Sequence, residues 1–177
     1  MVSQRRRGAE AQRERHANGL AEAWRERCAN GLAEVRRGMN LFSKSITSNI
    51  YQSMTILVVD DEADIQALFE QRFRREIRSG ECVFAFAQSG EEALHYLRQH
   101  ASEAVLILSD INMPGMSGLE LLERIREQSP APPPYVVMIT AYGDPQKRAD
   151  ALRLGANDYL DKPLDFNALK QKLTQLT

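Results

Sequence analysis

The sequence has no long apolar run, few cysteines and histidines, and almost no net charge. No run approaches the roughly 18 residues of a membrane-spanning helix, and no apolar stretch of a secretory signal follows the arginine-rich start. We therefore expect no transmembrane segment and a cytoplasmic protein. Cys28 and Cys82 lack metal-binding or redox spacing, which argues against a disulfide scaffold or a zinc site. None of His16, His95 and His100 has a cysteine, serine or carboxylate at a catalytic spacing.

The formal net charge of −1 conceals two segments of opposite sign. Residues 1–53 contain ten basic and five acidic side chains, whereas residues 54–177 contain 13 basic and 19 acidic ones. Only the leader therefore offers a basic patch of the kind that neutralises phosphates. Because a nucleic-acid backbone requires a basic surface, we expect no nucleic-acid binding by the body.

The leader contains a twelve-residue repeat, RHANGLAEAWRE at 15–26 followed by RCANGLAEVRRG at 27–38. Two copies of this length are too few for a solenoid. An apolar stripe from Leu20 to Val35 is interrupted by two Asn-Gly pairs, so residues 1–53 are predicted to be a disordered leader. Since Met54 directly precedes the first strand, the same interpretation includes upstream sequence that is translated because an early start codon was chosen. The alternative is a basic amphipathic helix that docks on anionic lipid or a partner.

From Met54 onward, apolar runs alternate with helical periods, which predicts a parallel sheet built from strand–helix units. Capping-box spacing in SGEE at 89–92 and SGLE at 117–120 indicates two helix starts. Pro145 after Asp144 indicates another start, and Gly155 indicates its end. Five helices are expected between and after five strands, and the strands are predicted at Thr55–Val59, Cys82–Ala87, Ala104–Ser109, Tyr135–Thr140 and Asn157–Asp161.

Polar side chains follow these strands at the points where they end. Because the carboxyl ends of parallel strands share one edge of the sheet, five of them should converge there: Asp60, Asp61, Asp110, Thr140 and Lys162. Three carboxylates and one ammonium total −2, which a divalent cation would offset. Oxygen ligands without histidine or cysteine suit Mg²⁺. A carboxylate beside Mg²⁺, a lysine and a hydroxyl is an arrangement for accepting a phosphoryl group.

Residues 54–177 closely resemble the receiver domain of two-component response regulators. Four motifs carry the resemblance: ILVVDDE at 56–62, SDINMPGMSGLEL at 109–121, ITAYG at 139–143 and NDYLDKP at 157–163. The resemblance implies a flavodoxin-like, doubly wound α/β fold with a five-stranded sheet in the order 2-1-3-4-5. It also implies a cis peptide bond between Lys162 and Pro163 and a phosphorylation-dependent signalling switch.

The same resemblance assigns a role to each residue that matches a family position. Asp110 is implied as the phosphoacceptor, with Lys162 and Thr140 contacting the phosphoryl oxygens and Tyr159 as the aromatic switch. Asp61, Asp110 and the backbone carbonyl of Asn112 are implied as Mg²⁺ ligands, and Asp60 acts through a water. The implied activity is that of a Mg²⁺-dependent phosphoacceptor that dephosphorylates itself, rather than an enzyme.

The implied phosphodonor is a histidine kinase or a histidine phosphotransfer protein. The implied output is altered affinity for an unidentified downstream protein, through the face formed by the fourth helix, fifth strand and fifth helix. We expect a stand-alone receiver without an output domain. A weaker likeness, in QRFRREIR at 71–78 and AYGD at 141–144, is to receivers fused to nucleotide cyclase or serine phosphatase outputs, which would make the chain a fragment of such a protein or a stand-alone relative.

Two other functions share parts of this pattern. A phosphatase of the haloacid dehalogenase type also forms an aspartyl phosphate, but it uses an Asp-x-Asp motif after its first strand. This chain has adjacent aspartates there, and Asn112 stands two residues after Asp110. An inactive pseudo-receiver is disfavoured by the complete set of acidic residues.

Overall fold

The computed structural model describes residues 54–100, 105–128, 133–141 and 144–176, together with Glu22 and Glu26. The predictions for the leader and its repeat lie outside these residues. Within the described ranges, five parallel strands form one sheet in the order β2-β1-β3-β4-β5, as predicted. The strands are β1 (Met54–Val59), β2 (Cys82–Ala87), β3 (Val105–Asp110), β4 (Tyr135–Ala141) and β5 (Asp158–Lys162).

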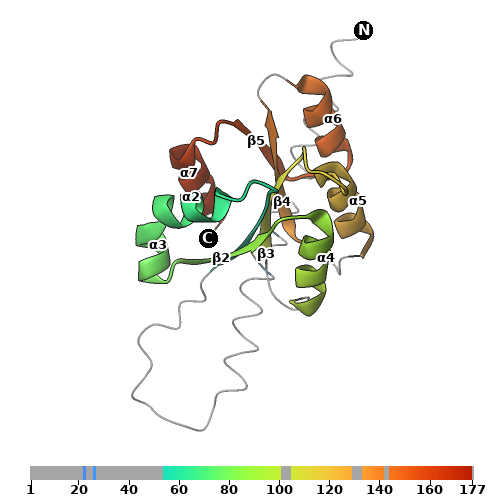
Figure 1. The fold of residues 1–177 in the computed structure, drawn as a ribbon. Coiled ribbons are helices and arrows are strands. Elements are labelled where there is room, and N and C mark those ends of the chain that lie inside the picture. The colour runs from blue at the N-terminus through green and yellow to red at the C-terminus, as the bar shows by residue number, and fades with distance from the viewer. Residues whose placement is uncertain are drawn as a thin grey trace.

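Helices cover both faces of this sheet (Figure 1). One face is covered by α2 (Ile65–Arg72), α3 (Arg74–Ser79) and α7 (Phe166–Leu176), and the other by α4 (Gly90–Gln99), α5 (Gly118–Gln128) and α6 (Pro145–Arg153). Each face has its own apolar cluster, because successive side chains of a buried strand point to opposite sides. Leu57 and Ile107 belong to one cluster, and Ile56 and Leu106 belong to the other.

The helix starts follow the sequence signals. Ser89 accepts a hydrogen bond from the backbone of Glu92, and Ser117 exchanges backbone and side-chain bonds with Glu120. Asp144 caps α6 by accepting from the Lys147 amide at 3.0 Å. These bonds satisfy amide groups that have no partner inside the helix. The three predicted helix starts are therefore confirmed, and the capping box is complete at Ser117–Glu120, whereas the Glu92 side chain accepts from the Gln88 amide instead of from Ser89.

The predicted number of helices is wrong. The described ranges contain six of them, since the single helix expected between the first two strands divides at Phe73 into α2 and α3. Phe73 leaves helical geometry at φ −104° and ψ 16°, and its ring is buried against Phe69 and Phe84. Neither glycine nor proline marks this break, so the sequence carries no local signal for it.

Strand bounds differ from the prediction by one residue at several ends. Asp110 and Thr140 lie inside their strands, at or next to the last residue, and Lys162 is the last residue of β5. The backbone of all three is therefore fixed by the sheet ladder. The Lys162–Pro163 peptide bond is cis, as the resemblance implies.

Candidate functional site

Three aspartates form a cluster at the carboxyl edge of the sheet. One carboxylate oxygen from each of Asp60, Asp61 and Asp110 lies within 4.8 Å of the others. Asp60 is fully buried and Asp110 is 4% exposed, whereas Asp61 faces solvent. Because β1 and β3 are adjacent in the sheet, residues 50 positions apart in sequence meet at neighbouring strand ends.

Lys162 neutralises part of this charge from the end of β5. Its Nζ lies 2.9 Å from Asp110 Oδ2, 3.1 Å from Asp60 Oδ2 and 2.9 Å from Glu62 Oε1. Burial lowers the pKa of Lys162, but its hydrogen bonds to Asp110, Glu62 and Asp60 outweigh this effect and raise the pKa overall. Lys162 is therefore a permanent cation that contacts the carboxylates of both buried aspartates.

Burial raises the pKa of Asp60, against the lowering effect of a backbone hydrogen bond from Glu62 and of Lys162. The Glu62 amide donates to Asp60 Oδ1 at 3.0 Å, and the Asn112 amide donates to Asp110 Oδ1 at 3.3 Å. Both buried carboxylates are thus oriented by the loop that follows their own strand.

The ligand chemistry of this cluster fits a hard divalent cation. All three clustered side chains offer carboxylate oxygens, and neither histidine nor cysteine takes part. The charges of Asp60, Asp61 and Asp110 exceed that of Lys162 by two, so one divalent ion would balance them.

A close backbone approach holds Asp110 in place. A Cβ added to Gly118, the first residue of α5, would lie 2.0 Å from the Asp110 carbonyl oxygen. The Gly118 amide also donates to the carbonyl of Ile111 at 3.0 Å. Only glycine permits the start of α5 to lie this close to the end of β3.

Thr140 is fully buried in β4, and its hydroxyl donates to the Ala141 carbonyl at 3.4 Å. It pairs in register with Asp161 of β5, two residues beyond Tyr159. The half-buried Tyr159 ring packs at the margin of the apolar cluster shared with α5 and α6. The predicted switch pair therefore lies on adjacent strands.

Three participants at this edge were absent from the predicted set. Glu62 completes the carboxylate set around Lys162, and its only sequence signal is its place after the two aspartates. The Arg148 guanidinium lies 4.7 Å from the centroid of the Tyr159 ring and is hydrogen-bonded to Asp161. Lys147, one residue earlier in α6, contacts the Asn112 side chain.

The structure thus combines a doubly wound sheet with an acidic cluster, a lysine and a buried threonine at the carboxyl edge of that sheet. The family model for the response regulator receiver domain matches residues 56–174. The chain belongs to this family. Within the described ranges, no helix is long and apolar enough to cross a membrane.

Individual relatives agree with this assignment. The chain is 36% identical over 123 residues to the response regulator RppA of Synechocystis sp., covering 70% of this chain and 50% of RppA. It is 35% identical to the two-component response regulator PhoP of Pseudomonas aeruginosa, covering 70% of this chain and 51% of PhoP. The chain thus spans about half the length of these two curated relatives.

Solved structures show the same fold. The chemotaxis protein CheY4 of Vibrio cholerae superposes with a TM-score of 0.60 at 26% identity, over 71% of this chain and 99% of CheY4. The receiver domain of the response regulator TorR superposes with a TM-score of 0.58 at 31% identity, over 70% of this chain and 95% of the TorR chain. The family match and the fold therefore assign the chain to the response regulator receiver domains, and the haloacid dehalogenase alternative is set aside.

Proposed function

We propose that Asp110 accepts a phosphoryl group from a histidine kinase or a histidine phosphotransfer protein. One observation carries the proposal: the Asp110 carboxylate is almost buried, yet it lies within an acidic cluster and contacts Lys162 Nζ. A buried acidic cluster destabilises a fold, and groups held at such a cost concentrate at functional sites. A site for a divalent cation and a phosphoryl group is such a purpose.

In the proposed transfer, a carboxylate oxygen of Asp110 bonds to phosphorus while the bond from phosphorus to the donor imidazole nitrogen breaks. The released imidazole takes up a proton from solvent. Lys162 offsets charge on the phosphoryl oxygens, and the Thr140 hydroxyl donates a hydrogen bond to one of them. Hydrolysis of the acyl phosphate returns the free carboxylate, so the chain is a stoichiometric acceptor that dephosphorylates itself.

Asp61, Asp110 and the carbonyl of Asn112 would hold Mg²⁺ directly, and Asp60 would do so through a water. Bound Mg²⁺ supplies positive charge that lets a phosphate dianion approach the carboxylates. The acidic cluster and its oxygen ligands support this assignment. We expect Asp61→Asn to weaken Mg²⁺ binding more than Asp60→Asn does, as measured by fluorescence titration or calorimetry.

The proposed output is a change of the surface formed by α6, β5 and α7, where an unidentified downstream protein would bind. A phosphoryl oxygen that draws the Thr140 hydroxyl toward Asp110 leaves space behind it for the Tyr159 ring. Arg148 covers that ring and is bonded to Asp161, so a Tyr159 movement would also alter α6. Activation is then a shift between two populated states.

Acceptance of the phosphoryl group is tested with a small phosphodonor, Mg²⁺ and intact-mass spectrometry. Wild type should gain one phosphoryl group, and Asp110→Asn should gain none. Asp64→Asn removes an exposed carboxylate nearby and should behave like wild type. Equal labelling of Asp110→Asn and wild type would contradict the proposed role of Asp110.

The coupling is tested separately, by amide chemical shifts with and without a phosphate analogue. In wild type we expect shifts at Tyr159 and along residues 144–154. Thr140→Ala should still bind the analogue, while the distant shifts should be lost. Shifts confined to the surroundings of Asp110 in wild type would contradict coupling through Thr140 and Tyr159.

A further inference from the structure

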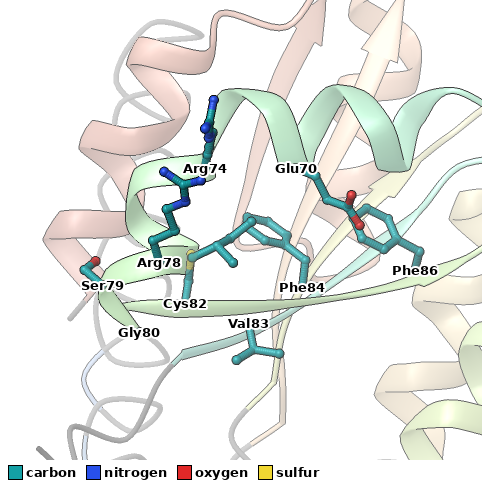
Figure 2. A pocket seen from close by; sticks show the side chains of 10 residues that line it. Glu70, Arg74, Arg78, Ser79, Gly80, Cys82, Val83, Phe84 and Phe86 are labelled. Carbon is teal, nitrogen blue, oxygen red and sulfur yellow. The ribbon is translucent and has the colours of Figure 1, made fainter.

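The sheet edge at β2 bears an apolar groove that the proposed phosphoryl chemistry does not use. The groove holds about 580 Å³ between α3 and β2, and Phe84 and Phe86 line it from the strand (Figure 2). The described ranges have three exposed large hydrophobic side chains, and two of them belong to α3 and β2 beside the groove. Ile77 of α3 is 37% exposed, and Val83 of β2 is 49% exposed with its side chain on the far side of the strand from α3 (Figure 2). A contiguous exposed apolar patch on a protein commonly marks an interaction site.

The β2 edge also lacks the features that protect free sheet edges. Its sequence, CVFAFA, contains neither charge nor proline, and the described residues offer no strand to its outer side. β5 at the opposite edge reads DYLDK and carries three charged side chains. Proteins commonly protect an edge strand with charge, proline or a covering element. An apolar edge without such protection is suited to pairing with another strand.

The hydrogen-bond register shows which β2 groups are available. The Met54 amide donates to the Glu81 carbonyl and the Asp60 amide to the Ala87 carbonyl, so the odd-numbered residues of β2 face β1. By the alternation of a strand, the backbone groups of Cys82, Phe84 and Phe86 point outward. Phe84 is central to this set. Antiparallel pairing with an identical strand would set Phe84 opposite Phe84 and Cys82 opposite Phe86, each pair exchanging two hydrogen bonds.

The charges beside the groove also suit the twofold symmetry of such an antiparallel pair. The helices run antiparallel to the strand, so Glu70 lies toward the Phe86 end and Arg78 toward the Cys82 end (Figure 2). Both side chains are exposed, and neither has an ion-pair partner among the described residues. Glu70 accepts only an amide hydrogen bond, from Gln66 at 2.8 Å. A twofold axis through Phe84 would set Glu70 of each copy against Arg78 of the other.

We propose that this groove and edge form a symmetric dimer interface, in which β2 pairs antiparallel with β2 of a second copy. The occupant is a second copy because the edge register and both flanking charges are self-complementary. The leader of the same chain fits less well, since its net charge of +5 has the same sign as Arg74 and Arg78 beside the groove. The interface lies at the β2 edge of the sheet, opposite the β5 edge, and does not depend on phosphorylation of Asp110.

The test uses charge reversal in the full-length chain and analytical ultracentrifugation. Wild type should show a concentration-dependent equilibrium between monomer and dimer. Glu70→Arg and Arg78→Glu should each weaken the dimer by about tenfold or more, since each variant meets two like-charge pairs. An equimolar mixture of these two variants should recover the dimer, because both pairs then have opposite charges. Arg98→Glu, an exposed reversal on α4, should leave the equilibrium unchanged.

Hydrogen exchange provides a second readout, and circular dichroism checks that each variant is folded. In the dimer, the Cys82, Phe84 and Phe86 amides should exchange more slowly than in dilute monomer. A wild type that stays monomeric at all attainable concentrations would overturn the proposal. So would a mixture that fails to recover the dimer, or an equal loss in Arg98→Glu. A monomer with protected β2 amides would show that the leader covers the edge instead.

Discussion

Asp60→Asn should stabilise the fold when no divalent ion is present. At an effective dielectric constant of about 20, like charges 4.8 Å apart repel by about 3.5 kcal/mol, and Asp60 has two carboxylate neighbours with an oxygen within that distance. Its attraction to Lys162 at 3.1 Å is worth about 5 kcal/mol on the same scale. Asparagine removes all three interactions and still accepts the Glu62 amide. These terms leave a net gain of about 2 kcal/mol, which solvent screening of the exposed Asp61 lowers. Asparagine also relieves the cost of burying the Asp60 charge, which is the main cause of its raised pKa, so the expected net gain stays at about 1 to 2 kcal/mol.

The assay is urea unfolding at pH 7 in a chelator, followed by circular dichroism. Saturating Mg²⁺ should remove the advantage of the variant, since the cation offsets the same repulsion in wild type. Asp64→Asn, with an exposed carboxylate outside the cluster, serves as the control and should change little. An Asp60→Asn variant that is less stable than wild type in chelator would refute the electrostatic reasoning.

The stability advantage of Asp60→Asn over wild type should also depend on pH. Burial raises the pKa of Asp60 above its usual value of 3.8, so the folded state binds this proton more tightly than the unfolded chain does. The stabilisation from protonated Asp60 is fully present when the pH is below the pKa of Asp60 in the unfolded chain. It is lost as the pH rises through the pKa of Asp60 in the folded state. The advantage of Asp60→Asn should therefore grow from acid to neutral pH.

Three further predictions concern the support of the site and the extent of the domain. Gly118→Ala should cost at least about 2 kcal/mol in urea unfolding and slow labelling of Asp110, because its Cβ would lie 2.0 Å from a backbone oxygen. Arg126→Met should lower the free energy of unfolding by about 2 to 4 kcal/mol, since Arg126 donates to the Gly155 carbonyl through two nitrogens and to two other acceptors. Arg126→Lys should recover only part of this loss. An unchanged unfolding midpoint in Arg126→Met would contradict a stabilising role for these hydrogen bonds. A shortened chain that begins at Met54 should match the full chain in melting temperature and phosphoryl uptake, and a much lower melting temperature would show that residues 1–53 support the fold.

The sheet and most of the acidic site were predictable because strand–helix alternation determines where strand ends gather. Once the runs at β1, β3 and β5 are assigned as parallel strands, Asp60, Asp110 and Lys162 must share an edge. The capping boxes could be predicted from the spacing of two residues within one helical turn. These features depend on contacts that are local or imposed by topology.

The other contacts depend on side-chain packing between elements, which spacing does not determine. Arg126 of α5 reaches the Gly155 carbonyl, 29 residues away, and burial lowers its pKa to about 10. The contact between Arg148 and Tyr159 and the break at Phe73 arise from packing in the same way. A pattern of residue types in sequence contains no information on which arginine will be buried.

The central claim is tested most directly by locating the phosphoryl group on the chain. The full-length protein is treated with a small phosphodonor, with Mg²⁺ or with a chelator, and the acyl phosphate is reduced with borohydride before tandem mass spectrometry. We predict modification of Asp110 in Mg²⁺ and none in chelator. Modification at Asp60 or Asp61 instead, or equal modification of Asp110 in chelator, would contradict the assignment of a Mg²⁺-dependent phosphoacceptor at the end of β3.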